Sequence, residues 1–295
     1  MSQFILLADV LEREYFPRKR DITAASTKTH YRIAVRHLGI MLDRPPIVAD
    51  LTDDTIEQFI TWCLNVRGLA RYTVKQRRGY LVALWNWCAR RKISPEFPTV
   101  PALSVPRHVP QAWTLEQLQL LIAACKQSRG SFAGVPACDW WTSIHCFWFY
   151  EGERLGATLA ARWSDYQAGV LVIHAHDRKG RNLPAAYHLH PTVAMWLDRI
   201  RSPQRDLIWP FPYHRSRFYQ LYRELVDSAG LPWCKRTGPQ KLRRTHASHV
   251  MASGGDPTAS LFHSSPDVTR RFYLDPTVAK PVPQNRLLPP IDSDG

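Results

Sequence analysis

The sequence contains little that would direct the chain into a membrane or out of a cell. No run approaches the roughly 20 consecutive apolar residues that a membrane-spanning helix needs. The N-terminal FILLA run is short for a signal-peptide core and is quickly followed by Asp9. The six cysteines form no CxxC pair, so we interpret them as reduced thiols. We therefore expect a cytoplasmic protein with no membrane partner.

Acidic residues are few relative to basic ones. The 295 residues include 39 Lys and Arg against 25 Asp and Glu, a formal net charge of +14. Such an excess favours a polyanionic partner through counterion release, and double-stranded DNA is the leading candidate. The sequence also lacks a P-loop and a cluster of acidic metal ligands, so we expect no cofactor. A hydrophobic content of 45% with 11 tryptophans indicates a folded chain rather than a disordered one.

Histidines occur in two HxH pairs, His174/His176 and His188/His190. Alternation along a β-strand would place the members of each pair on one face. A metal site is the alternative interpretation, but no carboxylate or thiolate is apparent nearby. We predict no metal.

Residues 1–97 have the pattern of a helical domain. The segment after Thr23, the segment capped by Thr52, and the segment with a capping box at Thr73 and Gln76 all show helical apolar spacing. Two of these helices also carry a basic face, which is typical either of a solvated surface or of DNA contact. The candidate phosphate contacts are Lys28, Arg32, Lys75, Arg77 and Arg78.

The proline-rich stretch 98–112 cannot continue a helix and is predicted to be a linker. The second domain, 113–280, opens with a capping box at Thr114 and Gln117. Within it, residues 169–189 predict a β-hairpin with a Lys-Gly turn, and helices follow from Pro191 and over 216–230. The expected fold is mainly α: a helical domain, a linker, a mostly helical domain with a small antiparallel sheet, and a tail over 281–295.

Short stretches of the second domain occur in an order that resembles the catalytic domain of the tyrosine recombinases, the phage-integrase family. They are GERLGATLAARWSDY (152–166), RKG (178–180), QKLRRTHASHVMASGG (240–255) and LFHSSPDVTRRFYLDP (261–276). The first domain resembles the helical, SAM-like core-binding domain of that family, so the likeness extends to about residue 280. By position, the resemblance assigns these catalytic residues: Arg154 and Arg243 as the arginines, Lys179 as the lysine, Gln240 at the first place of the usual His-x-x-Arg motif, His263 as the histidine before the nucleophile, and Tyr273 as the nucleophile.

The resemblance implies that a tyrosine attacks a DNA phosphodiester, forms a 3′-phosphotyrosyl bond and frees a 5′-hydroxyl. It also implies a homo-oligomer, a tetramer on DNA. The residue types suit this chemistry, because guanidiniums stabilise charge on phosphate oxygens, a lysine can protonate the leaving oxygen, and a histidine can donate near neutral pH. The covalent intermediate conserves the energy of the broken bond, so neither ATP nor a metal is required.

Some positions depart from the family pattern. Gln240 replaces a histidine, and an amide can hydrogen-bond a phosphate oxygen but cannot exchange a proton. Ala157 stands where an acidic residue usually supports the first arginine, so other groups must orient Arg154. Phe262 replaces the usual glycine before the histidine.

The position of the nucleophile also departs from the pattern. In many family members it lies nine residues after the histidine, which here is Phe272, whereas Tyr273 lies ten residues after His263. Phenylalanine has no hydroxyl. Either an adjustment around Pro266 brings Tyr273 to the phosphate, which we favour, or the site is disabled.

The leading hypothesis is a site-specific recombinase or integrase from a mobile element. The rival is a DNA-binding protein that keeps the fold but has lost the reaction, and a third possibility is a monomeric, topoisomerase-like relaxase. In the tail, Leu287 and Leu288 either dock on a neighbouring protomer or belong to a frayed terminus.

Overall fold

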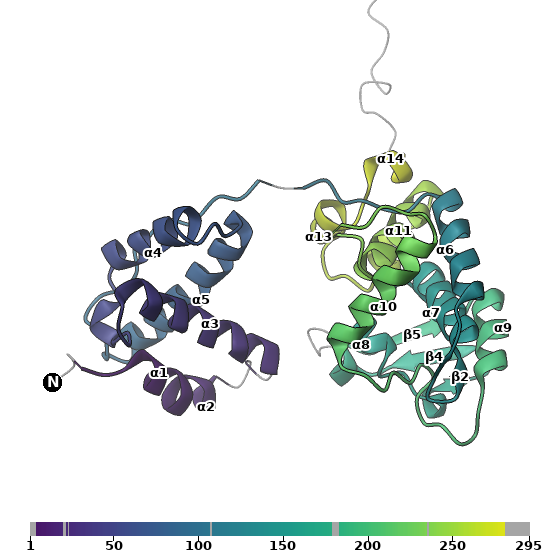
Figure 1. Cartoon of the computed structure of the whole chain (residues 1–295), viewed down its shortest axis with the longest axis horizontal. Coiled ribbons are helices and arrows are strands. Elements are labelled where there is room, and N and C mark those ends of the chain that lie inside the picture. Colours follow the sequence, from purple (N-terminus) through teal and green to yellow (C-terminus); the bar gives the residue numbers. More distant parts are fainter. Residues whose placement is uncertain are drawn as a thin grey trace, which may run out of the picture. The chain divides into compact units, whose positions relative to one another are not determined.

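The computed structural model describes residues 4–19, 22, 24–106, 108–178, 183–234 and 236–280. The chain divides into two compact units, Met1–Arg107 and His108–Gly295, and the division falls inside the proline-rich stretch. Each unit has its own hydrophobic core, and each is mainly helical (Figure 1). The fold is mainly α, as predicted. Within the described ranges, every helix is too short or too polar to cross a membrane.

Unit 1 is built from helices, with α3 packed against α5 and α4. The face of α4 predicted to be apolar is buried, because Ile56, Phe59 and Cys63 are all fully inaccessible to solvent. A further core contact joins Tyr15 to Tyr31 through their hydroxyls at 2.8 Å. The elements are α1 (Leu7–Asp9), the π-helical turn η1 (Val10–Tyr15), α2 (Phe16–Arg18), α3 (Ala25–Leu42), the 3₁₀ turn η2 (Val48–Asp50), α4 (Asp53–Asn65) and α5 (Arg71–Arg90).

Of the helix starts predicted in unit 1, one is confirmed, one is wrong and one lies outside the described residues. The Thr52 cap is confirmed, since its Oγ1 accepts a hydrogen bond from the backbone N–H of Thr55 at 3.2 Å. The capping box at Thr73 is wrong, because α5 already begins at Arg71. The earlier start adds helical backbone before Val74, whose side chain is completely buried, and packing of that kind outweighs a local cap. Thr23 lies outside the described residues, and Ala24 precedes α3.

Unit 2 combines helices with two small antiparallel sheets. Its elements are α6 (Leu115–Gln127), β1 (Ser131–Phe132), β2 (Val135–Pro136), α7 (Ala137–Glu151), α8 (Leu155–Thr158), the 3₁₀ turn η3 (Trp163–Asp165), β3 (Tyr166–Gln167), β4 (Val170–Ile173), the 3₁₀ turn η4 (Ala175–Asp177), β5 (Ala185–His188), α9 (Pro191–Ile200), α10 (Arg215–Ser228), α11 (Gln240–Ala252), α12 (Pro257–Ser260), α13 (Pro266–Phe272) and α14 (Pro276–Ala279).

The predicted hairpin of unit 2 is confirmed. Strands β4 and β5 pair antiparallel, with Leu171 opposite Tyr187, and the short β3 adds a third strand in the order β3-β4-β5. The capping box at Thr114 is also confirmed, since its Oγ1 accepts from the Gln117 N–H and its own N–H donates back to the Gln117 side chain. The separate β1-β2 pair was not predicted, because each of its strands has only two residues.

The prediction that the HxH pairs alternate along strands is wrong. His174 and His176 lie on either side of the start of η4, their rings stacked 5.5 Å apart, because the chain leaves β4 at Ile173. Carboxylates also lie closer than the sequence suggested: Asp165 contacts His174, and Asp177 contacts His176. Among the described residues, however, no group of three or more His, Cys, Asp or Glu is arranged to hold a metal ion.

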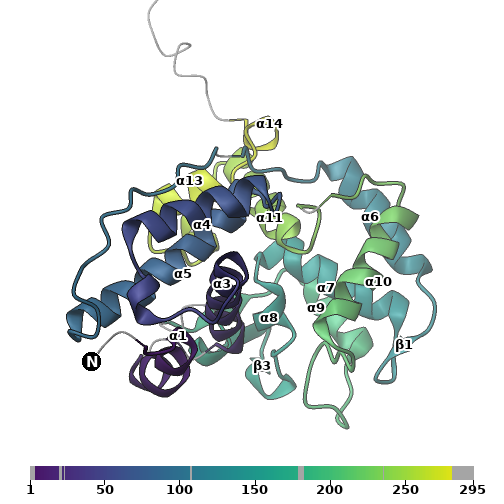
Figure 2. The same ribbon diagram turned by 60° about the vertical axis from the view of Figure 1, so that its left-hand side comes forward.

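Helix α7 forms the centre of unit 2. It contacts α6, α9 and α11, and Figures 1 and 2 both show it among these helices. Almost its whole surface is buried, including Trp140, Phe147 and Trp148, as expected of a helix that is apolar on all sides. The helix ends at Glu151, and Gly152 follows with a positive φ of 69°. This turn directs the next residues, Glu153 and Arg154, towards α11.

Candidate active site

The structure brings together five of the residues predicted to be catalytic, although they are far apart in the sequence: Arg154, Gln240, Arg243, His263 and Tyr273. Arg154 immediately precedes α8, Arg243 lies on α11, His263 lies between α12 and α13, and Tyr273 follows α13. Hydrogen bonds or ring contacts connect each of them to at least one other. Lys179 lies outside the described residues.

Arg243 is the most enclosed member of the cluster, with no exposed surface. Its Nη1 donates to the carbonyl oxygen of Gly152 at 2.5 Å, and its Nη2 donates to Leu261 O at 2.8 Å and to His263 Nε2 at 3.0 Å. Burial and the nearby Arg154 lower the pKa of Arg243, but a guanidinium stays charged at neutral pH because its ordinary pKa is above about 12. The site therefore contains a fixed cation.

Glu153 is a functional candidate that the sequence did not reveal. Its carboxylate is buried and accepts hydrogen bonds from Arg178, from Tyr187 and from the backbone N–H of Arg154. Burial alone would raise the pKa of Glu153, but Arg243 and these donors hold it below its ordinary value. The acid missing at Ala157 is thus matched by a carboxylate at a different position. The only sequence signal was an acidic residue directly beside Arg154.

His263 is held between the arginines and a hydroxyl. Its Nε2 lies 3.0 Å from Arg243 Nη2 and 3.5 Å from Arg154 Nη2, so Nε2 accepts, because a guanidinium can only donate. Nδ1 therefore carries the proton and donates to Thr269 Oγ1 at 2.9 Å. Burial and the nearby arginines lower the pKa of His263 to about 4. The imidazole is neutral at pH 7.

Tyr273, and not Phe272, lies at the cluster. The Tyr273 ring centroid is 5.5 Å from the Arg243 guanidinium carbon and 4.6 Å from the His263 ring, whereas Phe272 is 61% exposed. Helix α13 begins only at Pro266, and Ser265 before it has an extended backbone, so the segment between the histidine and the helix is not helical. That an adjustment around Pro266 brings Tyr273 to a phosphate stays a prediction.

The backbone after the tyrosine is anchored to α11. Ser248 is fully buried, and its Oγ donates to the carbonyl oxygen of Tyr273 at 3.3 Å and accepts from the N–H of Asp275 at 2.9 Å. The tyrosine side chain itself remains partly exposed. The tyrosine thus lines an open cavity while its main chain is fixed.

Gln240 contacts the tyrosine directly. As the first residue of α11, it is exposed, and its Nε2 donates to Tyr273 Oη at 3.2 Å. The amide therefore orients the phenolic oxygen. The open cavity beside these groups has a volume of about 790 Å³. Its lining includes Arg154, Gln240 and Tyr273, together with Asp177, Arg215 and Tyr219.

Comparison with known proteins gives a likeness in structure only. No protein-family model matches the sequence. No curated protein matches it either. Among solved structures, a lambda integrase dimer bound to a COC′ core site is similar with a TM-score of 0.68 at 15% identity, over 88% of this chain and 96% of that one. The Tn1549 transposon integrase in complex with transposon right end DNA gives 0.73 at 11% identity, over 96% and 99%.

A third match is the XerH site-specific recombinase bound to a palindromic difH substrate. Its TM-score is 0.62 at 15% identity, over 83% of this chain and 75% of that one. The chain has the tyrosine recombinase fold. Within this tyrosine recombinase fold, the described residues that the sequence resemblance selected in unit 2 occupy one cluster.

The basic residues predicted to contact phosphates lie on α3 and α5 of unit 1, where several have partners within the protein. Arg32 forms a two-point ion pair with Glu12, at 2.6 and 2.9 Å. Arg77 donates to His37 Nδ1 at 2.9 Å, and Arg78 donates to the carbonyl oxygen of Val100. The ammonium group of Lys28 lies 5.5 Å from the Phe16 ring, and Lys75 is exposed.

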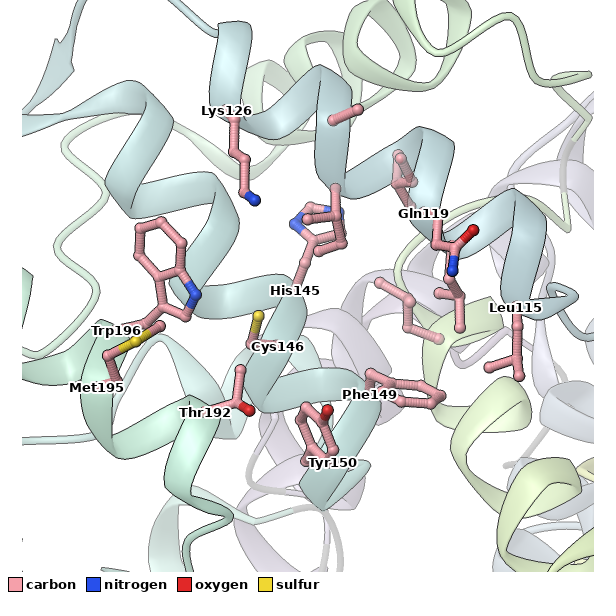
Figure 3. A pocket seen from close by; sticks show the side chains of 15 residues that line it. Leu115, Gln119, Lys126, His145, Cys146, Phe149, Tyr150, Thr192, Met195 and Trp196 are labelled. Atoms are coloured by element: carbon pink, nitrogen blue, oxygen red, sulfur yellow. The ribbon is translucent and has the colours of Figure 1, made fainter.

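An apolar pocket of about 640 Å³ also lies in unit 2, between α6, α7 and α9 (Figure 3). Leu115 and Gln119 come from α6, Phe149 and Tyr150 from α7, and Met195 from α9. None of the described residues predicted to be catalytic lines it. It is therefore distinct from the arginine-lined cavity.

Proposed function

We propose that this protein is a site-specific DNA recombinase that cuts and rejoins DNA through a 3′-phosphotyrosyl intermediate. The observation that supports this most strongly is the convergence of Tyr273, Arg154 and Arg243, from three separate segments, beside one open cavity. The net charge of +14 supports DNA as the substrate. The DNA-bound integrases and recombinase with the same fold point in the same direction.

In the proposed reaction, Tyr273 Oη forms a bond to phosphorus and the bond from phosphorus to the 5′-oxygen breaks. The phenol releases its proton to solvent, and the 5′-oxygen gains one from Lys179. Arg154 has a side chain that is 25% exposed, so its guanidinium is accessible to a phosphate oxygen. Arg243 adds fixed positive charge behind it. The reverse attack by a partner strand's 5′-hydroxyl reseals the DNA.

The neutral His263 limits how the phosphate can bind. In the structure its Nε2 accepts from the arginines, whereas a phosphate oxygen would need a donor there. A phosphodiester would bring negative charge against these arginines and so favour the protonated imidazole. His263 would then donate to the phosphate through Nε2 while Nδ1 stays on Thr269.

The wider assembly follows from the same proposal. Lys28, Arg32, Lys75, Arg77 and Arg78 of unit 1 contact phosphates, and base readout rests on fewer side chains. The protein acts as a homo-oligomer, a tetramer on DNA, as a lambda integrase tetramer does on a Holliday junction. The tail with Leu287 and Leu288 lies outside the described residues, and its docking on a neighbouring protomer remains part of this proposal.

A nicked suicide substrate tests the reaction, because loss of the short downstream strand traps the covalent adduct. Wild-type protein should give a DNA-protein band on a denaturing gel, and Tyr273→Phe should give none. Tyr213→Phe, which removes an exposed hydroxyl elsewhere in unit 2, should react like wild type. The double variant Phe272→Tyr/Tyr273→Phe moves the phenol back one residue and should not restore the adduct.

The same gel separates the alternatives. Tight binding of the correct site without any adduct would show a protein that keeps the fold but not the reaction. Adduct formation with supercoil relaxation, but without exchange between two sites, would indicate a relaxase. An adduct that persists in Tyr273→Phe would overturn the assignment of the nucleophile.

A further inference from the structure

We propose that Glu153 is the positioning residue of this site: its single buried carboxylate holds Arg154 and Arg243 in place and links them to Arg178. The inference rests on the proposed function. Four segments of unit 2 meet at this side chain, namely the α7–α8 turn, α11, the end of η4 and strand β5.

One carboxylate oxygen faces the arginines. Glu153 Oε1 accepts from the backbone N–H of Arg154 at 2.6 Å, which fixes the start of α8. The same oxygen lies 3.5 Å from Arg243 Nη1 and 3.9 Å from Arg154 Nη1. A single negative charge therefore lies between two guanidiniums that would otherwise repel each other.

The other oxygen faces the sheet. Glu153 Oε2 accepts from Arg178 Nε at 2.7 Å and from the Tyr187 hydroxyl at 2.7 Å. Arg178 also donates from Nη1 to the carbonyl oxygen of Leu183 at 3.3 Å. Arg178 and Leu183 are the described residues on either side of 179–182. Arg178 thus joins Glu153 to the backbone just before β5.

Phe262 covers this ion pair. Its ring centroid lies 5.0 Å from the guanidinium carbon of Arg178 and 5.3 Å from the Tyr187 ring. Its φ of 52° is in the left-handed region, which a bulky residue rarely adopts. A glycine would relieve that strain but would leave the pair uncovered. The phenylalanine excludes water on one side of the pair, and a lower local dielectric strengthens the interaction.

Glu151 offers an internal comparison two residues earlier. Its carboxylate is also buried, but it accepts only from the backbone N–H of His190 at 3.1 Å, among the contacts of the described residues. Burial raises the pKa of Glu151, whereas that of Glu153 is lowered by its cationic partners. Two buried acids of similar depth therefore have different surroundings, and only Glu153 contacts the arginines.

The test compares Glu153→Gln with Glu151→Gln in the full-length chain. Single-turnover cleavage of the suicide substrate is measured beside DNA affinity by gel shift. Glu153→Gln should cleave about 100-fold more slowly, the scale of loss from misplacing a reacting group, with a Kd close to that of wild type. Glu151→Gln should cleave at nearly the wild-type rate. Glu153→Asp keeps the charge on a shorter side chain and should recover part of the rate.

A second measurement does not depend on DNA cleavage. Nitrogen-15 spectra of arginine side chains should show separated, slowly rotating Nη protons for Arg178 and Arg243 in wild type. Those signals should merge in Glu153→Gln and remain in Glu151→Gln. If Glu153→Gln is too unstable for spectra, the same comparison is made with Glu153→Asp, where partial merging is expected.

The outcomes are distinct. Equal rate losses in the Glu151 and Glu153 variants, or unchanged arginine spectra in Glu153→Gln, would overturn the inference. A wild-type protein that forms no adduct on its DNA site, but whose arginine signals respond to Glu153 as described, would refute the proposed function and leave the positioning of the arginines by Glu153 intact.

Discussion

Two sets of paired arginines, one in each unit, have opposite surroundings. In unit 1, Arg32 pairs with Glu12 and Arg44 with Asp50, and both arginine side chains are about half exposed. In unit 2, Arg178 and Arg243 are buried around Glu153. An exposed pair contributes little to stability and can exchange its partner. A buried cation that loses its carboxylate has no water to replace it.

This difference suits two tasks. Surface arginines can leave a carboxylate for a phosphate at small cost, which is what a binding surface requires. Buried arginines keep one geometry before and after a substrate arrives, which is what stabilisation of a transition state requires. Under the proposed function, unit 1 supplies adaptable contacts and unit 2 supplies a preorganised site.

The largest expected effect comes from disturbing the buried side of this comparison. In Gly152→Ala, the new Cβ would lie 2.6 Å from a carbon of the His246 ring and 2.8 Å from Leu261, at a φ of 69°. The left-handed conformation costs an alanine roughly 1–2 kcal/mol, and the overlap adds about 1–3 kcal/mol. Chemical denaturation of unit 2 would measure the loss.

Gly254→Ala is the matched control for that variant. Gly254 also has a positive φ, 81°, but a Cβ added there would meet nothing within 4 Å, so only the conformational cost applies. If Gly152→Ala and Gly254→Ala lower the free energy of unfolding equally, then the contacts of the new Cβ with His246 and Leu261 add nothing to the conformational cost.

A smaller effect is expected from acid. Burial lowers the pKa of His145 and His246 to about 4. Burial and the nearby arginines lower the pKa of His263 to about 4 as well, and all three histidines belong to unit 2. In the unfolded chain a histidine has its ordinary pKa of about 6.5. Between about pH 4 and pH 6.5 the unfolded chain therefore binds more protons than the folded one. The stability of unit 2 should therefore be complete above about pH 6.5 and fall as the pH decreases towards 4.

Unit 1 has a shallower expected response, because His37 is its one histidine with a pKa lowered to about 4 among the described residues. Calorimetric unfolding between pH 7 and pH 4.5 should show the transition of unit 2 moving further than that of unit 1. Equal shifts of both transitions would contradict the assignment of neutral buried histidines to unit 2.

The smallest effect should come from the exposed pair. Glu12→Gln releases Arg32 and should change the free energy of unfolding by less than about 1 kcal/mol. DNA affinity should rise. Its dependence on salt concentration should also become steeper, by the amount expected for about one additional phosphate contact. Glu57→Gln makes the same charge change at an exposed position on α4. An identical salt slope in the two variants would show that Arg32 does not contact phosphate.

Much of the fold was predictable because its signals are local. The Thr114 capping box, the hairpin and the helix over 216–230 each depend on neighbouring residues, and the structure has all of them. The Thr73 start failed because burial of Val74 decides where α5 begins. Local caps are informative only where tertiary packing agrees with them.

The candidate site also has residues that the sequence predicted and one that it did not. The ordered motifs selected Arg154, Arg243, His263 and Tyr273, and the structure gathers them. Glu153 was missed because its role depends on Arg178 and Tyr187, which approach it only through the sheet. Spacing alone left open whether Tyr273 reaches the site or the site is disabled, since the side chain that faces the arginines depends on how the chain folds after His263.

The Ser248 anchor has a consequence for the direction of strand movement. Its hydroxyl holds the chain on both sides of residue 274, so a DNA end joined to Tyr273 would be tied to α11 through a short stretch of backbone. In the proposed reaction the freed 5′ end has no such tie. Exchange would then proceed by migration of the 5′ ends between stationary 3′ ends. Each cleaved 3′ end would stay attached to the protein until it is rejoined.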